Sequence, residues 1–194
     1  NKILDRLYYF LENNGFQYIA EAESIIECSI AELNENAIDT EHFPTVHGNL
    51  LNGIVKINYS NYSIGFVKES TNNFIKNFGF KENMHEIIDI LTLRSNVSYS
   101  GFLISGKNKF TQTVLNLLGK KHIFSVQVMP GLNIQIDDNS IILFHSTPIS
   151  ERTTKMNTHI YKLKNLPTFY GLLETFLYSK FLEPDMLILS KKKL

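Results

Sequence analysis

The sequence predicts an α+β fold in which helices are mixed with short antiparallel hairpins and a meander. Apolar residues recur at helical spacing in several stretches, and elsewhere they alternate with polar residues at the period of two expected of strands. These segments do not follow a regular strand and helix alternation, which argues against a doubly wound sheet. We expect residues 1–50 to form a helical region with an irregular loop, and residues 51–194 an α+β body, together one continuous domain.

Two helices are predicted in the N-terminal region. Apolar side chains of residues 2–13 fall on one stripe, and Gly15 supplies the usual helix stop. Ser24 and Glu27 have the spacing of a capping box, which predicts a second helix over residues 23–34.

The body is predicted from the same two periods. Alternation indicates a hairpin over residues 51–67, Gly119 is expected to stop a helix, and Pro184 to close the last one. The other predicted elements are, in order, helices 72–78 and 82–93, strand 97–104, helix 109–118, strands 122–128, 132–136, 140–144 and 153–164, helix 167–181 and strand 186–189.

Composition limits the function before any motif does. The chain has 19 basic and 19 acidic residues, so it has no basic excess with which to neutralise nucleic-acid phosphates. No apolar run approaches the roughly 20 residues of a membrane span. The single cysteine, Cys28, cannot form an intrachain disulfide and favours a reducing cytoplasm. Charged residues near the start argue against a secretion signal.

A possible metal site lies in the connection over residues 34–49, which we expect to be irregular. Asp39, Glu41, His42 and His47 form the only local cluster of potential metal ligands in the sequence. Zinc and iron sites usually place their ligands on rigid elements with tight spacing. A polar loop is therefore the favoured interpretation, and whether the cluster binds metal stays open.

The sharpest motif is the segment 101–107, which matches the phosphate-loop pattern G-x-x-x-x-G-K. Residues 102–104 are typical of a buried strand, however, and Asn108 stands where the magnesium-binding Ser or Thr belongs. A helix cap at Ser105 or Asn108 is the simpler interpretation. The functional alternative is a small cytoplasmic enzyme or ligand-binding domain that holds an anion or phosphate near Gly106–Asn108.

From residue 87 onward, the order of features resembles the TssG family, the wedge subunits of the type VI secretion baseplate. The stretch 87–94 keeps the apolar positions, Asp89 and Arg94 of a family helix of the form F-L-D-[IL]-F-N-H-R. Residues 114–118 and 124–128 are similar to the short L-x-x-L-L helix and the valine-rich strand that follow it in the family.

The resemblance implies a structural protein that joins others without catalysis and without a cofactor. It implies a cytoplasmic hetero-oligomer with TssF-like and TssK-like baseplate proteins, and no contact with nucleic acid. The loop over residues 34–52 and the last long helix are then expected to face partners. The expected interaction residues are Asp89, Arg94, Phe169, Tyr170, Leu173, Phe176 and Phe181.

Overall fold

The computed structural model describes residues 2–51, 53, 55–66, 89, 98–119, 122–129 and 131–191. The strands are β1 (Phe16–Ile26), β2 (Asn49–Leu50), β3 (Val55–Phe66), β4 (Ser98–Gly106), β5 (His122–Met129), β6 (Leu132–Asp137), β7 (Ser140–Ser150) and β8 (Thr153–Leu163). The helices are α1 (Lys2–Asn13), α2 (Ile30–Ile38), α3 (His42–Val46), α6 (Lys109–Leu118) and α7 (Thr168–Lys191).

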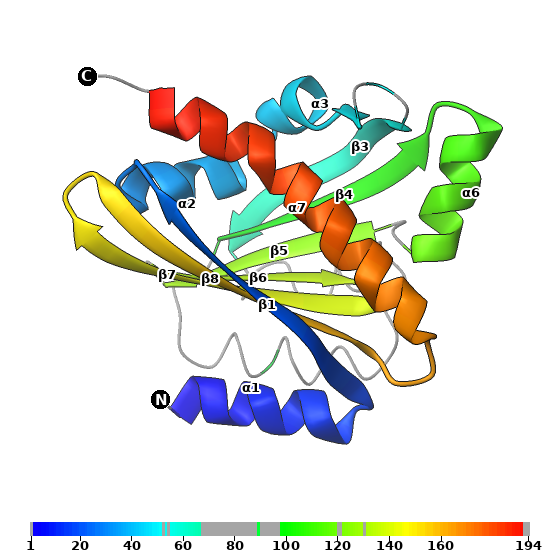
Figure 1. The fold of residues 1–194 in the computed structure, drawn as a ribbon, viewed down its shortest axis with the longest axis horizontal. Helices are drawn as coiled ribbons and strands as arrows, with labels where there is room; N and C mark the ends of the chain where they lie inside the picture. Colours follow the sequence, from blue (N-terminus) through cyan, green and yellow to red (C-terminus); the bar gives the residue numbers. More distant parts are fainter. Residues whose placement is uncertain are drawn as a thin grey trace.

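Within the described residues, the strands form one eight-stranded sheet in the order β1-β8-β7-β6-β5-β4-β3-β2. Every neighbouring pair of strands is antiparallel, and β4 to β8 form a meander. Figure 1 shows α7 crossing the sheet and α1 lying at its other side. The predicted α+β class is confirmed.

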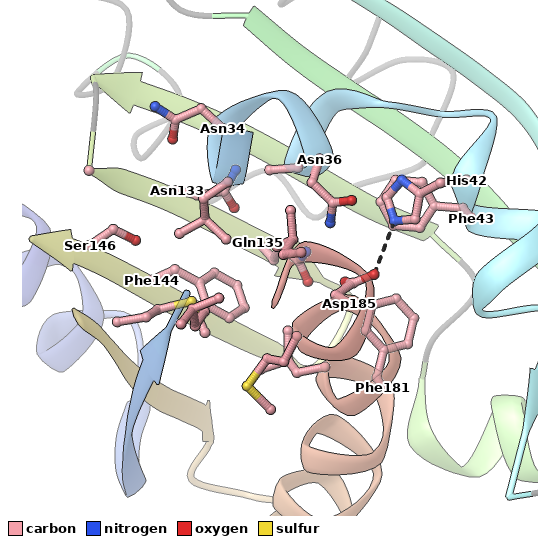
Figure 2. Close-up of a pocket in the computed structure, with 18 residues that line it drawn as sticks. Asn34, Asn36, His42, Phe43, Asn133, Gln135, Phe144, Ser146, Phe181 and Asp185 are labelled. Carbon is pink, nitrogen blue, oxygen red and sulfur yellow. Dashed lines mark ion pairs between the residues drawn. The ribbon is translucent and has the colours of Figure 1, made fainter. Parts of the chain in front are cut away.

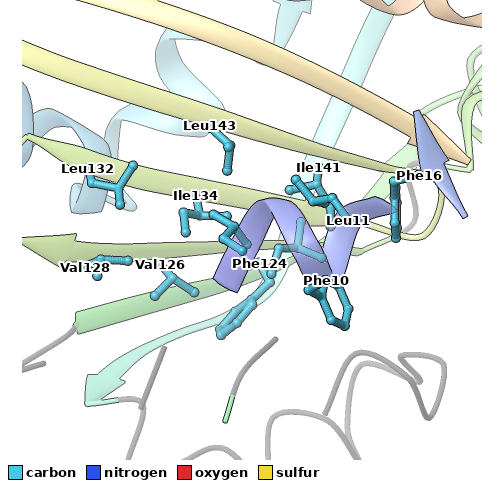
Figure 3. Packing of buried hydrophobic residues seen from close by; sticks show 12 residues of the cluster. Phe10, Leu11, Phe16, Phe124, Val126, Val128, Leu132, Ile134, Ile141 and Leu143 are labelled. Atoms are coloured by element: carbon cyan, nitrogen blue, oxygen red, sulfur yellow. The ribbon is translucent and has the colours of Figure 1, made fainter. Parts of the chain in front are cut away.

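One face of the sheet packs against α1. The inward side chains of β5, β6 and β7 alternate along each strand, as a half-buried strand requires, and together with α1 they form a dry cluster (Figure 3). Its members are Leu7, Phe10, Leu11, Phe16, Phe124, Val126, Val128, Leu132, Ile134, Ile136, Ile141 and Leu143.

The opposite face is covered by α7. Its buried residues recur at spacings compatible with one helical stripe, and they are Gly171, Glu174, Tyr178, Asp185 and Leu189. Tyr178 and Leu189 pack with Phe144 of β7 and Met156 of β8. None of the helices among the described residues is long and apolar enough to cross a membrane.

Elements with clear local signals form as predicted. Residues 2–13 are α1, and 109–118 are α6. The α6 helix starts at Asn108, whose side chain accepts a hydrogen bond from the Thr111 backbone N–H at 2.8 Å. It stops at Gly119, which has the left-handed φ of 67°. The predicted meander strands are also present, although β7 extends to Ser150.

The predicted helix over residues 23–34 is wrong in its first half. The chain up to Ile26 is part of β1, which pairs with β8 from Phe16 opposite Leu163 to Ile26 opposite Thr154. A capping box does exist, but it is formed by Ser29 and Glu32 at the start of α2. The hydrogen bonds that β1 makes with β8 outweigh the local helical pattern.

The predicted hairpin over residues 51–67 is also wrong. Residues 55–66 form the single strand β3, which pairs with β4 on both sides of an irregularity between Ser60 and Ser63. Asn61 lies there with a φ of 53°, a value that Asn tolerates better than most residues. The turn-like residues are therefore absorbed as a bulge.

Two further predictions fail at the ends of α2 and α7. The connection that was expected to be irregular contains the end of α2, the short helix α3 and the two-residue strand β2. The expected strand 186–189 is helical, because α7 continues through Pro184 to Lys191. Leu189 is buried on the sheet side, with Met186 packed beside it, so the apolar stripe continues past the proline. The predicted helices 72–78 and 82–93 lie outside the described residues, apart from Asp89.

Candidate metal centre

The chain between α2 and β2 brings two histidines together at either end of α3. Asp39 ends α2, and its carboxylate accepts a hydrogen bond from the Glu41 backbone N–H at 3.0 Å. His42 is the first residue of α3, and His47 is its C-terminal cap. The next residue must be glycine, because a Cβ on Gly48 would lie 2.2 Å from the Pro44 carbonyl oxygen.

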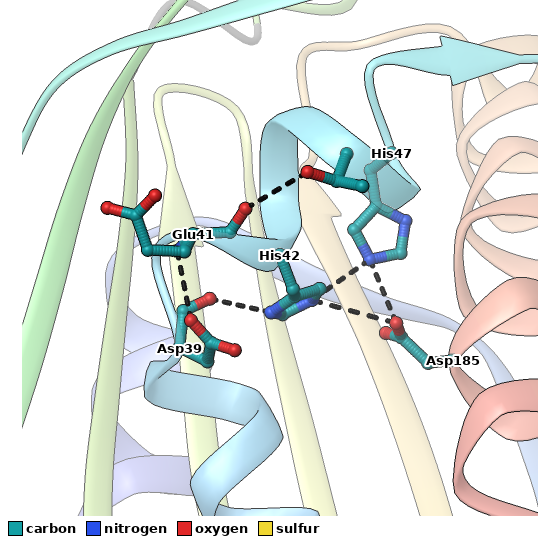
Figure 4. A network of polar contacts seen from close by, with 6 residues as sticks. Asp39, Glu41, His42, His47 and Asp185 are labelled. Carbon is teal, nitrogen blue, oxygen red and sulfur yellow. Dashed lines mark hydrogen bonds and ion pairs between the residues drawn. The ribbon is translucent and has the colours of Figure 1, made fainter.

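Asp185 reaches this histidine pair from α7 (Figure 4). One carboxylate oxygen, Oδ1, lies 3.0 Å from His47 Nε2 and 3.6 Å from His42 Nε2. The two Nε2 atoms are 3.2 Å apart. His47 is fully buried, and the side chains of His42 and Asp185 are 11% and 12% exposed. Three potential ligand atoms from two distant segments therefore converge on one point.

The hydrogen bonds around the triad leave lone pairs facing its centre. His42 Nδ1 lies 2.6 Å from the Asp39 carbonyl oxygen, which can only accept, so this nitrogen carries the proton. In the neutral ring, His42 Nε2 is then an acceptor that faces His47 and Asp185. A proton on His47 Nε2 could be donated to either His42 Nε2 or Asp185 Oδ1, but not well to both. A divalent cation between the three atoms would contact all of them.

The distances fit a metal ion of ordinary coordination. Histidine nitrogen and carboxylate oxygen bind zinc at about 2.0–2.2 Å, and at such lengths two ligands lie about 3.0 Å apart at the right angle of an octahedral site and about 3.4 Å apart at a tetrahedral angle. The three separations of 3.0, 3.2 and 3.6 Å agree with one face of such a site. Two histidines and one carboxylate with open positions form the ligand set of non-haem iron(II) oxygenases. The residues therefore fit iron.

Aromatic rings hold the histidines in place. The ring of Phe181 stacks on His47 with centroids 3.8 Å apart and an interplanar angle of 12°. Phe43 lies against His42 at 4.2 Å and against Phe102 at 4.5 Å. These contacts fix the ring orientations. The apolar rings also limit the access of solvent to the ligand atoms, as the hydrophobic shell of a metal site does.

Burial favours the neutral, metal-binding form of His42. It lowers the pKa of the imidazole below its ordinary value of 6.5, and the nearby His47 acts in the same direction. The Asp185 carboxylate and the Asp39 carbonyl oppose the shift without reversing it. His42 therefore stays deprotonated at a lower pH than a histidine in water, which suits a ligand that must offer its lone pair.

This pKa predicts that the metal-free protein loses stability in acid. The unfolded chain takes up a proton on His42 near pH 6.5, whereas the folded chain resists it to a lower pH. The free energy of unfolding should therefore fall as the pH drops below about 6.5, until the folded pKa is passed. Urea denaturation with chelator, from pH 7.5 to 5.5, measures this. His42→Asn should show a shallower decline, and equal slopes in the two proteins would contradict the assignment.

His42 and Asp185 open on a cavity of about 670 Å³, counting the space at its mouth (Figure 2). It lies between α2, the end of α7 and the middle strands of the sheet, and Figure 2 shows side chains from all three around it. The potential metal centre thus adjoins a partly open pocket that joins it to the space beneath α2 and α7.

The structure uses the predicted ligand cluster in part. His42 and His47 are in the triad, and Asp39 supports it through its carbonyl oxygen. The exposed Glu41 takes no part in the triad. Asp185 was missed, because the residues around it were predicted as a strand beyond the last helix. The continuing helical spacing of Tyr178, Asp185 and Leu189 was the signal that could have found it.

At Gly106–Asn108, where an anion site was suggested, backbone and side-chain groups bond to the start of α6. The Gly106 N–H donates to the Gln112 side chain at 3.0 Å, and the Asn108 side chain caps α6. A Cβ on Gly106 would lie 2.3 Å from the Gln112 backbone nitrogen, so the start of the helix fills this space. The capping interpretation is confirmed at Asn108.

The residues expected to contact partners are scattered. Phe169 and Phe176 are exposed on α7, and Tyr170 and Leu173 are half-buried. Phe181 faces inward, on His47. Asp89 is an exposed helical residue, and Arg94 lies outside the described residues.

Solved structures with a similar fold are Rieske oxygenases, whereas no family model and no curated protein sequence matches. The quaternary ammonium Rieske monooxygenase CntA with the inhibitor MMV12 has a TM-score of 0.58 at 10% identity, over 96% of this chain and 41% of that chain. CntA with L-carnitine has a TM-score of 0.57 at 11% identity, with the same coverage of 96% and 41%. Naphthalene 1,2-dioxygenase from Rhodococcus sp. with indole has a TM-score of 0.50 at 12% identity, over 97% and 48%.

These similarities show a shared fold, and this chain spans less than half the length of each of those three proteins. They overturn the resemblance to the TssG family. The predictions of a baseplate adaptor, of TssF-like and TssK-like partners and of no enzymatic activity are contradicted, because the proteins that share this fold are oxygenases of another family. The motifs behind that resemblance were short apolar helix and strand patterns, which recur in unrelated folds.

Proposed function

We propose that this chain is the substrate-binding and iron-binding part of a mononuclear non-haem iron oxygenase. His42, His47 and Asp185 would hold Fe(II), and the convergence of these three ligand atoms beside a cavity is the observation that carries the proposal. The fold shared with Rieske oxygenases supports it. Bound iron would supply activation of dioxygen at the coordination positions that the protein leaves open.

The chain's own residues would prepare the site for that chemistry. The Asp39 carbonyl holds the proton on His42 Nδ1, so that Nε2 is aimed at the metal. Phe43 and Phe181 hold the two imidazoles and exclude water. The adjoining cavity would place a substrate next to the triad, where proximity lowers the barrier to reaction.

Electrons would have to come from outside the printed sequence. A Rieske cluster is ligated by two cysteines and two histidines, and this chain has one cysteine, the buried Cys28. In one quaternary ammonium Rieske monooxygenase of similar fold, electrons are transferred between subunits. We infer that a separate domain or protein supplies electrons here. A reducing compartment such as the cytoplasm would suit both a ferrous ion and a free thiol.

Anaerobic titration with Fe(II) tests the proposal. We expect one ion per chain by calorimetry, and an electron paramagnetic resonance signal when nitric oxide is added as a probe of an open position. His47→Ala should weaken Fe(II) binding at least about 100-fold, because loss of even an outer partner of a ligand costs 10–100-fold.

The matched control is His145→Ala, since His145 is exposed on β7 and is no part of the triad. It should bind Fe(II) like the wild type. Equal affinity of His47→Ala and wild type would contradict the site. One tightly bound Zn(II) together with no measurable Fe(II) binding would contradict the assignment to iron.

A further inference from the structure

Polar side chains of β6 lie beneath helices and are half-buried. Leu132, Ile134 and Ile136 point into the cluster beneath α1, so Asn133 and Gln135 lie on the other face of the sheet. That face is covered by α2 and α7, and both residues line the cavity beside the triad (Figure 2). A polar strand face beneath a helix needs hydrogen-bond partners, because burying such groups without them is unfavourable.

Three side-chain amides in this cavity have unused hydrogen-bonding capacity. Asn133 is bonded to Ser125 of the neighbouring strand, at 3.1–3.2 Å. The amides of Gln135 and of Asn34 and Asn36, from α2, make no side-chain hydrogen bond to another residue in the described part of the chain. Figure 2 shows Asn36 beside Gln135. Each offers one acceptor oxygen and two donor hydrogens. They form a polar corner that a ligand with both a donor and an acceptor would match.

Charge is confined to the triad. Among the described residues that line this cavity, the only ionisable side chains are His42 and Asp185. The remaining wall is mainly apolar and includes Phe144, Met156, Leu182, Met186 and Leu189. With a divalent ion bound, the triad would carry a net positive charge, which would repel a cationic ligand placed beside it.

Gln135 also lines a second pocket, of about 690 Å³ when the open space at its mouth is counted, whose described walls are mostly apolar. Phe43 and Phe181 are shared by the two cavities, so they adjoin at the triad. Tyr59 lines the second one, and burial, with a further contribution from Asp185, raises the pKa of its phenol well above its ordinary value. That phenol is therefore uncharged, and an apolar body could extend to this side.

We propose that the substrate of this site is an uncharged molecule with an apolar body and one amide-like group that both donates and accepts hydrogen bonds. Gln135 and Asn36 bind that group, and the walls around Phe144 and Met156 bind the body within reach of the triad. This specificity rests on the proposed function. It differs from the quaternary ammonium compounds named for CntA, because the described walls offer no counter-charge outside the triad.

A matched probe series tests the specificity: 4-phenylbutanamide, 4-phenylbutanoate and 3-phenylpropyl-trimethylammonium. Calorimetry is done on the metal-free protein and on the Zn(II)-loaded protein. We expect the amide to bind at least about tenfold more tightly than either charged probe in the metal-free protein, and than the ammonium probe in the Zn(II)-loaded protein, where the carboxylate can bind the metal itself. Gln135→Leu should weaken amide binding about tenfold, the effect of leaving one buried polar group unpaired. Gln135→Glu should move the preference of the metal-free protein toward the ammonium probe.

Gln17→Leu is the control, because Gln17 lies at the start of β1 and lines neither cavity. It should leave all three affinities unchanged. The inference is overturned if a charged probe binds the metal-free protein as tightly as the amide does, if the amide does not bind, or if both Gln135 variants bind like wild type. The metal-free measurement separates this result from the iron assignment, since loss of Fe(II) binding with the amide preference intact would contradict the iron assignment alone.

Discussion

Replacing Asp185 with alanine should raise the dissociation constant for Fe(II) more than about 100-fold. Asp185 provides the only negatively charged ligand atom of the triad, and its oxygen lies 3.0 Å from His47 Nε2. Without it, two neutral imidazoles remain, and the divalent ion loses both a bond and its charge compensation. Anaerobic calorimetry gives the affinity directly.

Asp185→Asn separates charge from shape. The amide fills nearly the same space on α7 but supplies no negative charge, so Fe(II) binding should stay weak. The pKa of His42 should fall further in both variants, because the Asp185 carboxylate raises it in the wild type. Glu183→Ala is the matched control, since Glu183 is exposed on the same helix and pairs only with Lys180 among the described residues. Wild-type Fe(II) affinity in Asp185→Ala would contradict the proposed centre.

Two of the three ligands of this centre could be predicted from the sequence. His42 and His47 stand five residues apart and were recognised together, because the cluster is local. The sequence did not predict that a single short helix would hold both rings toward one point. That arrangement depends on the close passage of Gly48 past Pro44 and on Phe181 stacked against His47, contacts that need the folded chain.

Asp185 could not be paired with the histidines from local patterns. Pro184 usually ends a helix, because it lacks an N–H and clashes with the preceding turn. Here the burial of Leu189 against the rest of the fold favours continuation of α7, which also brings Asp185 to the histidines. The length of α7 is therefore set by its packing against distant parts of the chain, which local sequence patterns do not show.

The secondary structure shows the same division between local and distant signals. The start of α6 at Asn108 and its stop at Gly119 were predicted, because both signals are local. The S-x-x-E pattern occurs at residues 24–27 and again at 29–32, and only the second caps a helix. The partner strand β8 excludes the first one, and it lies far along the chain.

Phe124→Ala should lower the free energy of unfolding by about 3–5 kcal/mol, the range for removing a buried phenylalanine ring. Phe124 is 1% exposed and belongs to the cluster between the sheet and α1. The loss approaches the total stability of many domains, which is about 5–15 kcal/mol. Urea denaturation at neutral pH with chelator present measures it.

A milder variant and an exposed control keep this prediction testable if Phe124→Ala fails to fold. Ile134→Val, at a residue with no exposed surface in the same cluster, should lower the free energy of unfolding by about 0.5–1.5 kcal/mol. Phe169→Ala should change it by less than about 0.5 kcal/mol, because Phe169 is 66% exposed on α7. The cluster lies on the α1 side of the sheet and the triad on the α7 side, so folded Ile134→Val should bind Fe(II) like the wild type. A larger effect from Phe169→Ala than from Ile134→Val would mean that the exposed side of α7 is covered in solution and that the cluster beneath α1 contributes less than its burial indicates.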